Sequence, residues 1–425
     1  MDDKRRKHRD FVQNMLIAVL SVSAVFLFMQ TQIYNLGLEN YSHIFSPSAA
    51  QKDMIVTEQN TGIVAPVRVA VTGAYGRYAS VTMTTGDETF DPLGRILGEV
   101  LGSARDDTVC SSQVYLDVLK GTSVYYDFLN PLPLSVLADF TGTDVDHTAH
   151  ARSLVVAPGE KGVELYVWDG EKTYRRYATA VSKESLESVV NQYEMGNAQF
   201  AFDGLDEEGN LPEVSPYALF LEKTPELEVL TEMTPAVDAE EILVKLQFNP
   251  NTKSRYTETG GTEVIMENGR SLRLQADGKI VYQSGGEGIL KVAETAGETP
   301  AMRDIAEGSK QLMDELAGLS GGDGTLYLTG IRQSGNETVL TYGYQVQGIP
   351  VCFSDGLEAG TITISEATVS DLSLRLRQYT VQEETSMLLP LRQALAIAER
   401  YEGAELFIGY AGDGNGRVKA CWLAE

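Results

Sequence analysis

The sequence predicts an α+β protein with a single N-terminal transmembrane helix, followed by a multi-domain extracytoplasmic body of antiparallel sheets with packed helices. Three observations predict this class. The residues from Phe11 to Met29 carry no charge. Alternating apolar and polar residues between tight-turn signals recur through the rest of the chain, and amphipathic helices interrupt them. At 425 residues, of which 43% are apolar, the chain is long enough for two or three domains.

The uncharged segment is long enough to cross a bilayer, because a helix that rises about 1.5 Å per residue covers about 28 Å over this length. Five basic residues between Lys4 and Arg9 precede it and place the N-terminus in the cytoplasm. A cleaved signal peptide is the alternative, but no small-residue cleavage site follows Met29. We therefore predict a cytoplasmic tail at 1–10, a transmembrane helix at 11–30 and a juxtamembrane linker at 31–63, in a single-pass protein of the cell membrane.

A narrow stripe of small residues runs along the predicted transmembrane helix. Ala18, Ser21 and Ala24 repeat at a spacing of three. Such a stripe lets a second transmembrane helix approach closely, so these residues are candidates for contact with a partner helix. The alternative is that they simply face lipid.

The first extracytoplasmic domain is predicted at 64–236 as an α+β unit. Asp91-Pro92 predicts a helix start with an N-cap and a proline at the first helical position. A second helix is predicted at 183–193, and residues 210–236 are predicted to form an irregular, proline-containing connection. The expected strands are 67–71, 80–84, 123–128, 153–157, 163–168 and 174–179.

A central β-rich domain at 237–298 and a C-terminal α+β domain at 299–425 are predicted to follow. Asn268-Gly269 and Asp277-Gly278 are hairpin turn signals between strands at 241–248, 262–266, 271–275 and 279–283. The last domain is expected to begin with a helix at 302–319 and to contain a second helix at 388–401. Its expected strands are 326–333, 338–346, 349–353, 361–364, 369–381 and 418–423.

Charge and cysteine content exclude some functions. The net charge is −26 although the first ten residues are basic, so the body is strongly acidic. Nucleic acids are bound by clustered Lys and Arg, and we expect no nucleic-acid partner. The three cysteines are an odd number, so the sequence predicts no disulfide framework.

Two motifs with catalytic associations are present but incomplete. Residues 318–322 match the G-x-S-x-G pattern around Ser320, yet a helix is predicted before the serine and no histidine follows it in the chain. Asp144, Asp146, His147 and His150 cluster in a loop-like stretch without a complete metal-ligand motif. We therefore assign no catalytic, cofactor-binding or metal-binding residues and expect no cofactor.

The remaining motifs resemble a known family. Leu246-Gln247-Phe248-Asn249-Pro250, the segment 255–257 and the segment 274–282 look like the central domain of the YycH regulatory proteins of Firmicutes. Residues 343–351, 408–410 and 420–423 are similar to that family's closing strands. The resemblance implies a non-enzymatic regulator that contacts the YycG (WalK) sensor histidine kinase through its transmembrane helix and outer domains in cell-wall homeostasis. A YycI-like protein is a further implied partner.

Two other functions stay open. An anchored cell-envelope hydrolase would use an unrecognised acidic pair, and a passive envelope assembly module would bind partners without changing kinase output. A cytoplasmic tail of about ten residues has no room for a catalytic domain. Inward signalling would therefore need a partner.

Overall fold

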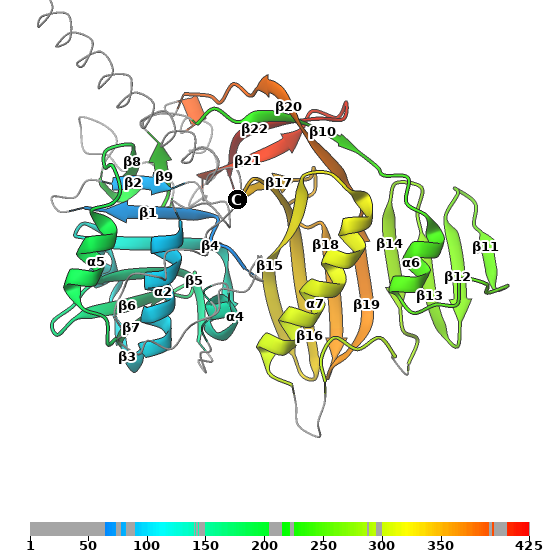
Figure 1. The fold of residues 1–425 in the computed structure, drawn as a ribbon, viewed down its shortest axis with the longest axis horizontal. Coiled ribbons are helices and arrows are strands. Elements are labelled where there is room, and N and C mark those ends of the chain that lie inside the picture. Colours follow the sequence, from blue (N-terminus) through cyan, green and yellow to red (C-terminus); the bar gives the residue numbers. More distant parts are fainter. Residues whose placement is uncertain are drawn as a thin grey trace, which may run out of the picture. The chain divides into compact units, whose positions relative to one another are not determined.

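The computed structural model describes residues 64–73, 78–81, 90–139, 141, 143, 149–203, 215–221, 225–286, 289–294, 300–390, 393–394 and 406–424. The predicted tail, transmembrane helix and linker lie outside the described residues, and so do Ala18, Ser21 and Ala24. Among the residues described, no helix combines the length and the apolar character needed to cross a membrane. The described residues all belong to one compact unit, 59–425. This unit is α+β, built from two sheets and α-helices (Figure 1).

The first sheet has nine strands in the order β3-β7-β6-β5-β4-β1-β2-β8-β9, and every neighbouring pair is antiparallel. The consecutive strands β4 to β7 form a four-stranded antiparallel meander within this sheet. The predicted strands agree with β1, β4, β5, β6 and β7, and 163–168 has the same limits as β6. The strands are β1 (Arg68–Thr72), β2 (Tyr78–Val81), β3 (Arg105–Cys110), β4 (Ser123–Pro133), β5 (His150–Pro158), β6 (Val163–Trp168), β7 (Tyr174–Ala178), β8 (Ala198–Phe200) and β9 (Leu219–Leu221).

Helices cover both faces of this sheet. α2 (Asp91–Ser103) and α5 (Lys183–Val190) pack on one face, where their leucine, isoleucine and valine side chains join the main core. α3 (Ser112–Leu119) packs on the other face against a layer rich in tyrosine. Both predicted helices are confirmed, although α5 ends at Val190 and the N-cap of α2 is Phe90 rather than Asp91. Asp91 instead lies in the first turn, where a negative charge favours the helix dipole.

The second sheet is larger and joins the predicted central and C-terminal ranges. Its strand order is β11-β12-β13-β14-β19-β18-β16-β17-β21-β22-β10-β20, with β15 paired to β16. The pair β17 and β21 is parallel. The strands are β10 (Glu228–Met233), β11 (Arg255–Thr257), β12 (Glu263–Glu267), β13 (Arg270–Leu274), β14 (Lys279–Gln283), β15 (Gly324–Ser334), β16 (Glu337–Val346), β17 (Ile349–Cys352), β18 (Gly360–Ser365), β19 (Thr368–Arg375), β20 (Gln378–Thr385), β21 (Leu406–Gly412) and β22 (Arg417–Ala424).

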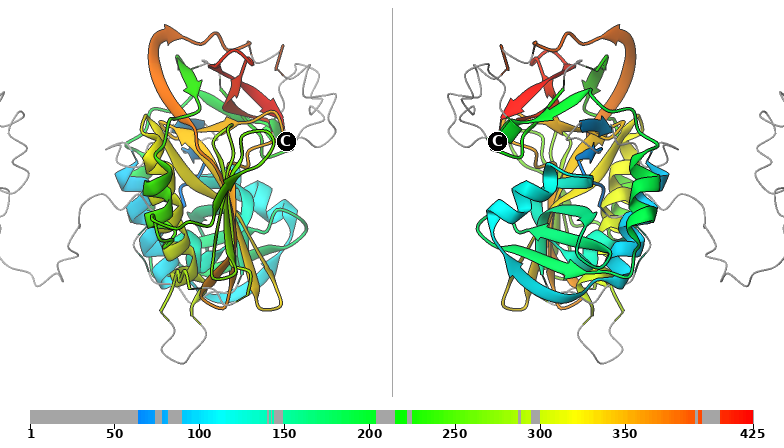
Figure 2. Two further views of the ribbon diagram at one scale, coloured as in Figure 1. Left: turned by 90° about the vertical axis from the view of Figure 1, so that its right-hand side faces the viewer. Right: turned by 90° about the vertical axis from the view of Figure 1, so that its left-hand side faces the viewer.

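Two helices lie together on one side of this sheet (Figure 2). α7 (Met302–Ala317) confirms the predicted helix and buries Ile305, Met313 and Leu316 against β-strand side chains. α6 (Ala239–Lys245) replaces the strand that was predicted at 241–248, so that prediction was wrong. The Asp238 carboxylate accepts the N–H of Glu240 at 2.9 Å and caps the helix. This cap and the burial of one helical face override the β-propensity of its isoleucine and valine.

Other predictions in this region need smaller corrections. The long strand expected at 369–381 is two strands, β19 and β20, which are separated at residues 376–377. The connection expected to be irregular at 210–236 contributes β9 and β10, and β10 pairs with β20 and β22. Most of the helix predicted at 388–401 lies outside the described residues, but 388–390 are not helical and 393–394 are.

A buried ion pair and apolar side chains join the two sheets. Arg68 on β1 pairs with Asp127 on β4, and its guanidinium also donates to the carbonyl oxygen of Leu406 on β21 at 2.9 Å. Leu129, Leu357 and Phe407 pack together beside this contact. Asp127 is fully buried, and Arg152 lies 3.8 Å from its other oxygen. We call Arg68, Asp127 and Arg152 the buried clamp.

Candidate interaction surfaces

The side of the second sheet that faces away from α6 and α7 is a candidate interaction surface. Alternate residues of each strand point to this side, and their neighbours pack on the helices. Ile362 and Leu372, for example, are paired across strands and buried with α7, whereas the neighbouring pair Thr361 and Ser373 faces the other way. We call this side the open face.

Strand register places the open-face residues in two rows across seven or eight strands. Most are part-exposed or exposed, which is typical of an antiparallel sheet with one solvated face. The first row is Gly330, Thr341, Thr361, Ser373, Val281, Arg273, Val264 and Tyr256. The second row is Arg332, Val339, Thr363, Asp371, Gln283, Ser271 and Met266.

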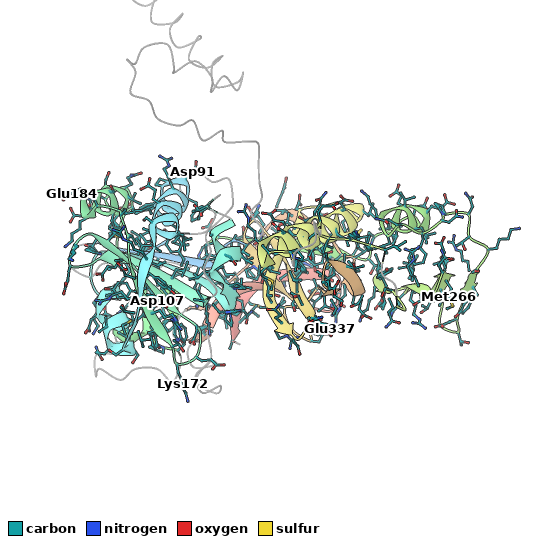
Figure 3. The ribbon with its side chains drawn as sticks, turned by 90° about the horizontal axis from the view of Figure 1, so that it is seen from below. Asp91, Asp107, Lys172, Glu184, Met266 and Glu337 are labelled. Carbon is teal, nitrogen blue, oxygen red and sulfur yellow. The ribbon has the colours of Figure 1, made fainter. Side chains whose placement is uncertain are left out.

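Hydroxyl groups, apolar groups and a few charges share this face. Tyr256 is 49% exposed and Met266 is 46% exposed at its β11–β12 end, where Figure 3 shows the labelled Met266. Arg273 and Arg332 form no ion pair with the described residues. Tyrosine, methionine and arginine are the residue types enriched at protein interfaces. The open face is therefore suited to binding a partner protein.

The Arg375 side chain fixes one border of the open face. Its guanidinium donates to Asp355 Oδ1 at 2.8 Å and stacks over the Phe353 ring, with 5.2 Å between the guanidinium carbon and the ring centroid. The hydrogen bond from Arg375 outweighs desolvation and holds the pKa of Asp355 below its ordinary value. The segment that carries Phe353 and Asp355 is thus held in place, and the charge of Lys279 also favours the ionised Asp355 carboxylate.

A polar groove of about 650 Å³ lies on the first sheet. Val167 and Tyr177 form its buried floor, and side chains of both charges line its walls, among them Arg105, Asp107 and His150. Asp107 pairs with Arg175 across β3 and β7. His150, which belongs to the acidic and histidine cluster noted in the sequence, lies at the start of β5 and lines this groove.

The sequence motifs with catalytic associations are placed as follows. Ser320 lies in a 3-10 turn at Gly318–Ser320 that continues α7, and β15 follows it, which is the reverse of a strand-to-helix nucleophile elbow. The Ser320 side chain is buried. Asp144, Asp146 and His147 lie outside the described residues. Among the residues described, no group of three His, Cys, Asp or Glu side chains is arranged to hold a metal ion.

The motifs that resemble the YycH family lie in and around the second sheet. Residues 246–250 follow α6, and the Phe248 ring packs edge-on against Tyr282 with 6.1 Å between centroids. Arg270 lies over the same ring at 4.4 Å. Residues 274–282 run from the last residue of β13 through the turn and along most of β14. These residues therefore hold α6 on the sheet.

No protein-family model, no curated protein and no solved structure matches this chain. The family resemblance thus stays a prediction from the motifs. Sequence reasoning did not identify the open face as a surface, because a strand pattern does not say which strands share a sheet. The signal available was the alternation of Thr361, Thr363 and Ser365 with the buried Ile362 and Ile364.

Proposed function

We propose that this chain is a membrane-anchored, non-enzymatic regulator that binds a YycG (WalK)-like sensor histidine kinase and modulates its activity in cell-wall homeostasis. The N-terminus is cytoplasmic, the helix at 11–30 spans the membrane once, and the body is extracytoplasmic. A YycI-like protein is a second proposed partner.

The open face is the single structural observation that supports this proposal most. It offers a broad sheet surface with aromatic, methionine and arginine side chains, backed by a core that includes the buried side chains of α7. A regulator that acts by contact needs such a surface more than it needs a reactive group. The family resemblance supplies the identity of the partner.

The transmembrane helix is the proposed route of communication with the kinase. Ala18, Ser21 and Ala24 would let the kinase helix approach closely, as small residues do in membrane helix pairs. The short cytoplasmic tail at 1–10 then needs no signalling domain of its own.

A crosslinked pull-down from cells tests the proposal. The full-length chain should recover a sensor kinase, and Thr361→Arg with Ser373→Arg should reduce that recovery, because two long cations at the centre of the open face block a close contact. Thr108→Arg, which adds one cation on the exposed edge strand β3, is a control for position and should leave recovery unchanged. If the intact chain recovers no kinase, and its deletion leaves cell-wall gene expression unchanged, the proposal fails.

A further inference from the structure

An apolar notch lies beside α6, on the helix-covered side of the second sheet. Its volume is about 330 Å³, which is at the lower end of the range for specific ligand pockets. Val244 of α6, Pro250 of the following loop and Leu319 after α7 supply its apolar lining. We call this cavity the α6 notch.

Part of the apolar lining is open to solvent. Val244 is 59% exposed, although Leu243 beside it is fully buried. An apolar pocket wall of this kind gains free energy when a partner's apolar side chain displaces its water. The notch has room for one side chain of that type.

Acidic residues form the rim. Glu240 and Glu241 occupy the first turn of α6 and are exposed, and neither side chain forms a hydrogen bond or a close ion pair with a described residue, although the charge of Glu240 acts on Arg255. Asp238 completes the acidic rim but is already engaged as the helix cap. Helical spacing brings Glu240 onto the same side as Val244, four residues later. In an extended strand, Glu240 and Val244 would lie farther apart than they do on adjacent turns of a helix.

The nearby cations are already paired. Lys245 donates to Glu315 Oε2 at 3.0 Å and thereby links α6 to α7 at one end of the notch. This hydrogen bond lowers the pKa of Glu315. Arg255 on β11 forms an ion pair with Glu263 on β12, and the charges of Glu240 and Asp238 also act on it. Because Lys245 and Arg255 each already have a carboxylate partner, the three rim carboxylates leave the notch with a net negative charge.

Helix stabilisation explains only part of this arrangement. Negative residues in the first turn favour the helix dipole, which accounts for Glu240 and Glu241 in isolation. It does not require an exposed valine one turn later, nor a cavity that Leu319 and Pro250 complete from two other segments. The combination is that of a binding site with an apolar anchor pocket and an acidic border.

We propose that the α6 notch binds a segment of a partner protein in which one leucine or aromatic side chain is flanked by Lys or Arg. The apolar side chain fills the notch, and the flanking cations lie over Glu240 and Glu241. Charge complementarity selects this partner over an acidic one, since like charges placed together oppose binding. The inference does not rest on the proposed kinase contact, because the notch and the open face are on opposite sides of the sheet.

Fluorescence anisotropy with defined peptides tests the proposal on the purified full-length chain. The probe is labelled Gly-Lys-Lys-Leu-Lys-Lys-Gly, and the controls replace its leucine by serine or its lysines by glutamates. We expect saturable binding that weakens as salt is added. Each control peptide should bind at least about tenfold more weakly, a difference that corresponds to about 1.4 kcal/mol.

Variants locate the binding site. Glu240→Lys with Glu241→Lys should weaken binding of the lysine peptide at least about tenfold and should favour the glutamate peptide. Glu184→Lys with Glu187→Lys makes the same charge change on the exposed side of α5 and should have little effect. Val244→Ser, at an exposed site that tolerates substitution, should reproduce the loss seen with the serine peptide.

Three results would overturn the inference. One is the lack of saturable binding up to about 1 mM peptide, a concentration that corresponds to a binding free energy of only about −4.1 kcal/mol. Another is equal loss of binding in the α5 and α6 charge variants, which would show a non-specific effect of net charge. The third is equal binding of the leucine and serine peptides, as expected if only a simple cation or an unanchored cationic surface were bound.

Discussion

Replacement of Asp127 by asparagine tests the buried clamp. Asp127 is fully buried, and its carboxylate is held by the Arg68 guanidinium and by the N–H of Leu129 at 2.9 Å. Asparagine keeps the size of the side chain and can still accept from Leu129. It removes the negative charge that balances Arg68, which is only 9% exposed, and Arg152, which is 14% exposed.

The cost follows from the cation that stays buried. Breaking a buried ion pair by removal of one partner costs about 3–5 kcal/mol, because the remaining charge is left uncompensated. When the asparagine oxygen accepts from Leu129, its NH2 group takes the place of the oxygen that faces Arg68 and cannot accept from that guanidinium, so we expect a loss of about 3–5 kcal/mol. That is a large share of the total of about 5–15 kcal/mol that stabilises a typical domain.

The same carboxylate gives the clamp a pH dependence. Burial alone would raise the pKa of Asp127, but the charges of Arg68 and Arg152 and the hydrogen bonds from Arg68 and Leu129 outweigh it and hold the pKa below the ordinary value of 3.8. A depressed pKa means that the stabilisation is complete above that ordinary value and is lost as the pH falls through the folded-state pKa. Acid unfolding should therefore steepen below about pH 4 in the native chain and less so in Asp127→Asn.

Urea unfolding followed by Trp168 fluorescence measures the effect. Trp168 lies in the first sheet with Arg152 over its ring at 5.2 Å, and Trp422→Phe removes the only other tryptophan signal. Glu187→Gln, an exposed carboxylate on α5, is the control and should change the free energy of unfolding by less than about 0.5 kcal/mol. If Asp127→Asn also changes it by less than this amount, the ion pair does not stabilise the fold as argued.

Three further substitutions test local packing, each by the free energy of unfolding in urea. Tyr342→Phe should stabilise the chain by about 1 kcal/mol, because the buried Tyr342 hydroxyl makes no hydrogen bond with the described residues; a loss of stability would indicate a partner for it. Tyr344→Phe should destabilise it by about 1 kcal/mol, since that hydroxyl donates to the Arg375 carbonyl oxygen at 3.1 Å, and an unchanged value would show that the hydrogen bond is dispensable. Gly269→Ala should cost about 1 kcal/mol, because Gly269 has a φ of 80° and its added Cβ would touch nothing; a neutral result would mean that the Asn268-Gly269 turn tolerates another backbone shape.

The strands that the sequence predicts well have clear alternation and marked turns. The β12–β14 hairpins follow from Asn268-Gly269 and Asp277-Gly278, because Asn268, Gly269 and Gly278 adopt the left-handed turn conformation that few other residues reach. The α2 helix follows in the same way from Pro92 and its apolar spacing. Such local signals do not depend on distant parts of the chain.

Long-range pairing explains what the sequence could not predict. Arg68 and Asp127 are 59 residues apart, and nothing near either residue marks the other as its partner. The α6 notch was missed because α6 itself was predicted as a strand, and Leu319 reaches the notch from a different helix. The open face likewise depends on which strands share a sheet, which is decided by the whole chain.

Site-specific photo-crosslinking in cells tests the central claim most directly. A photoreactive residue at position 361, in the middle of the open face, should form a covalent adduct with a sensor histidine kinase. The same residue in place of Lys172, in the exposed β6–β7 turn labelled in Figure 3, should not. Kinase adducts from position 361 alone are the predicted result. No kinase adduct from that position, or equal adducts from both, would contradict regulation through the open face.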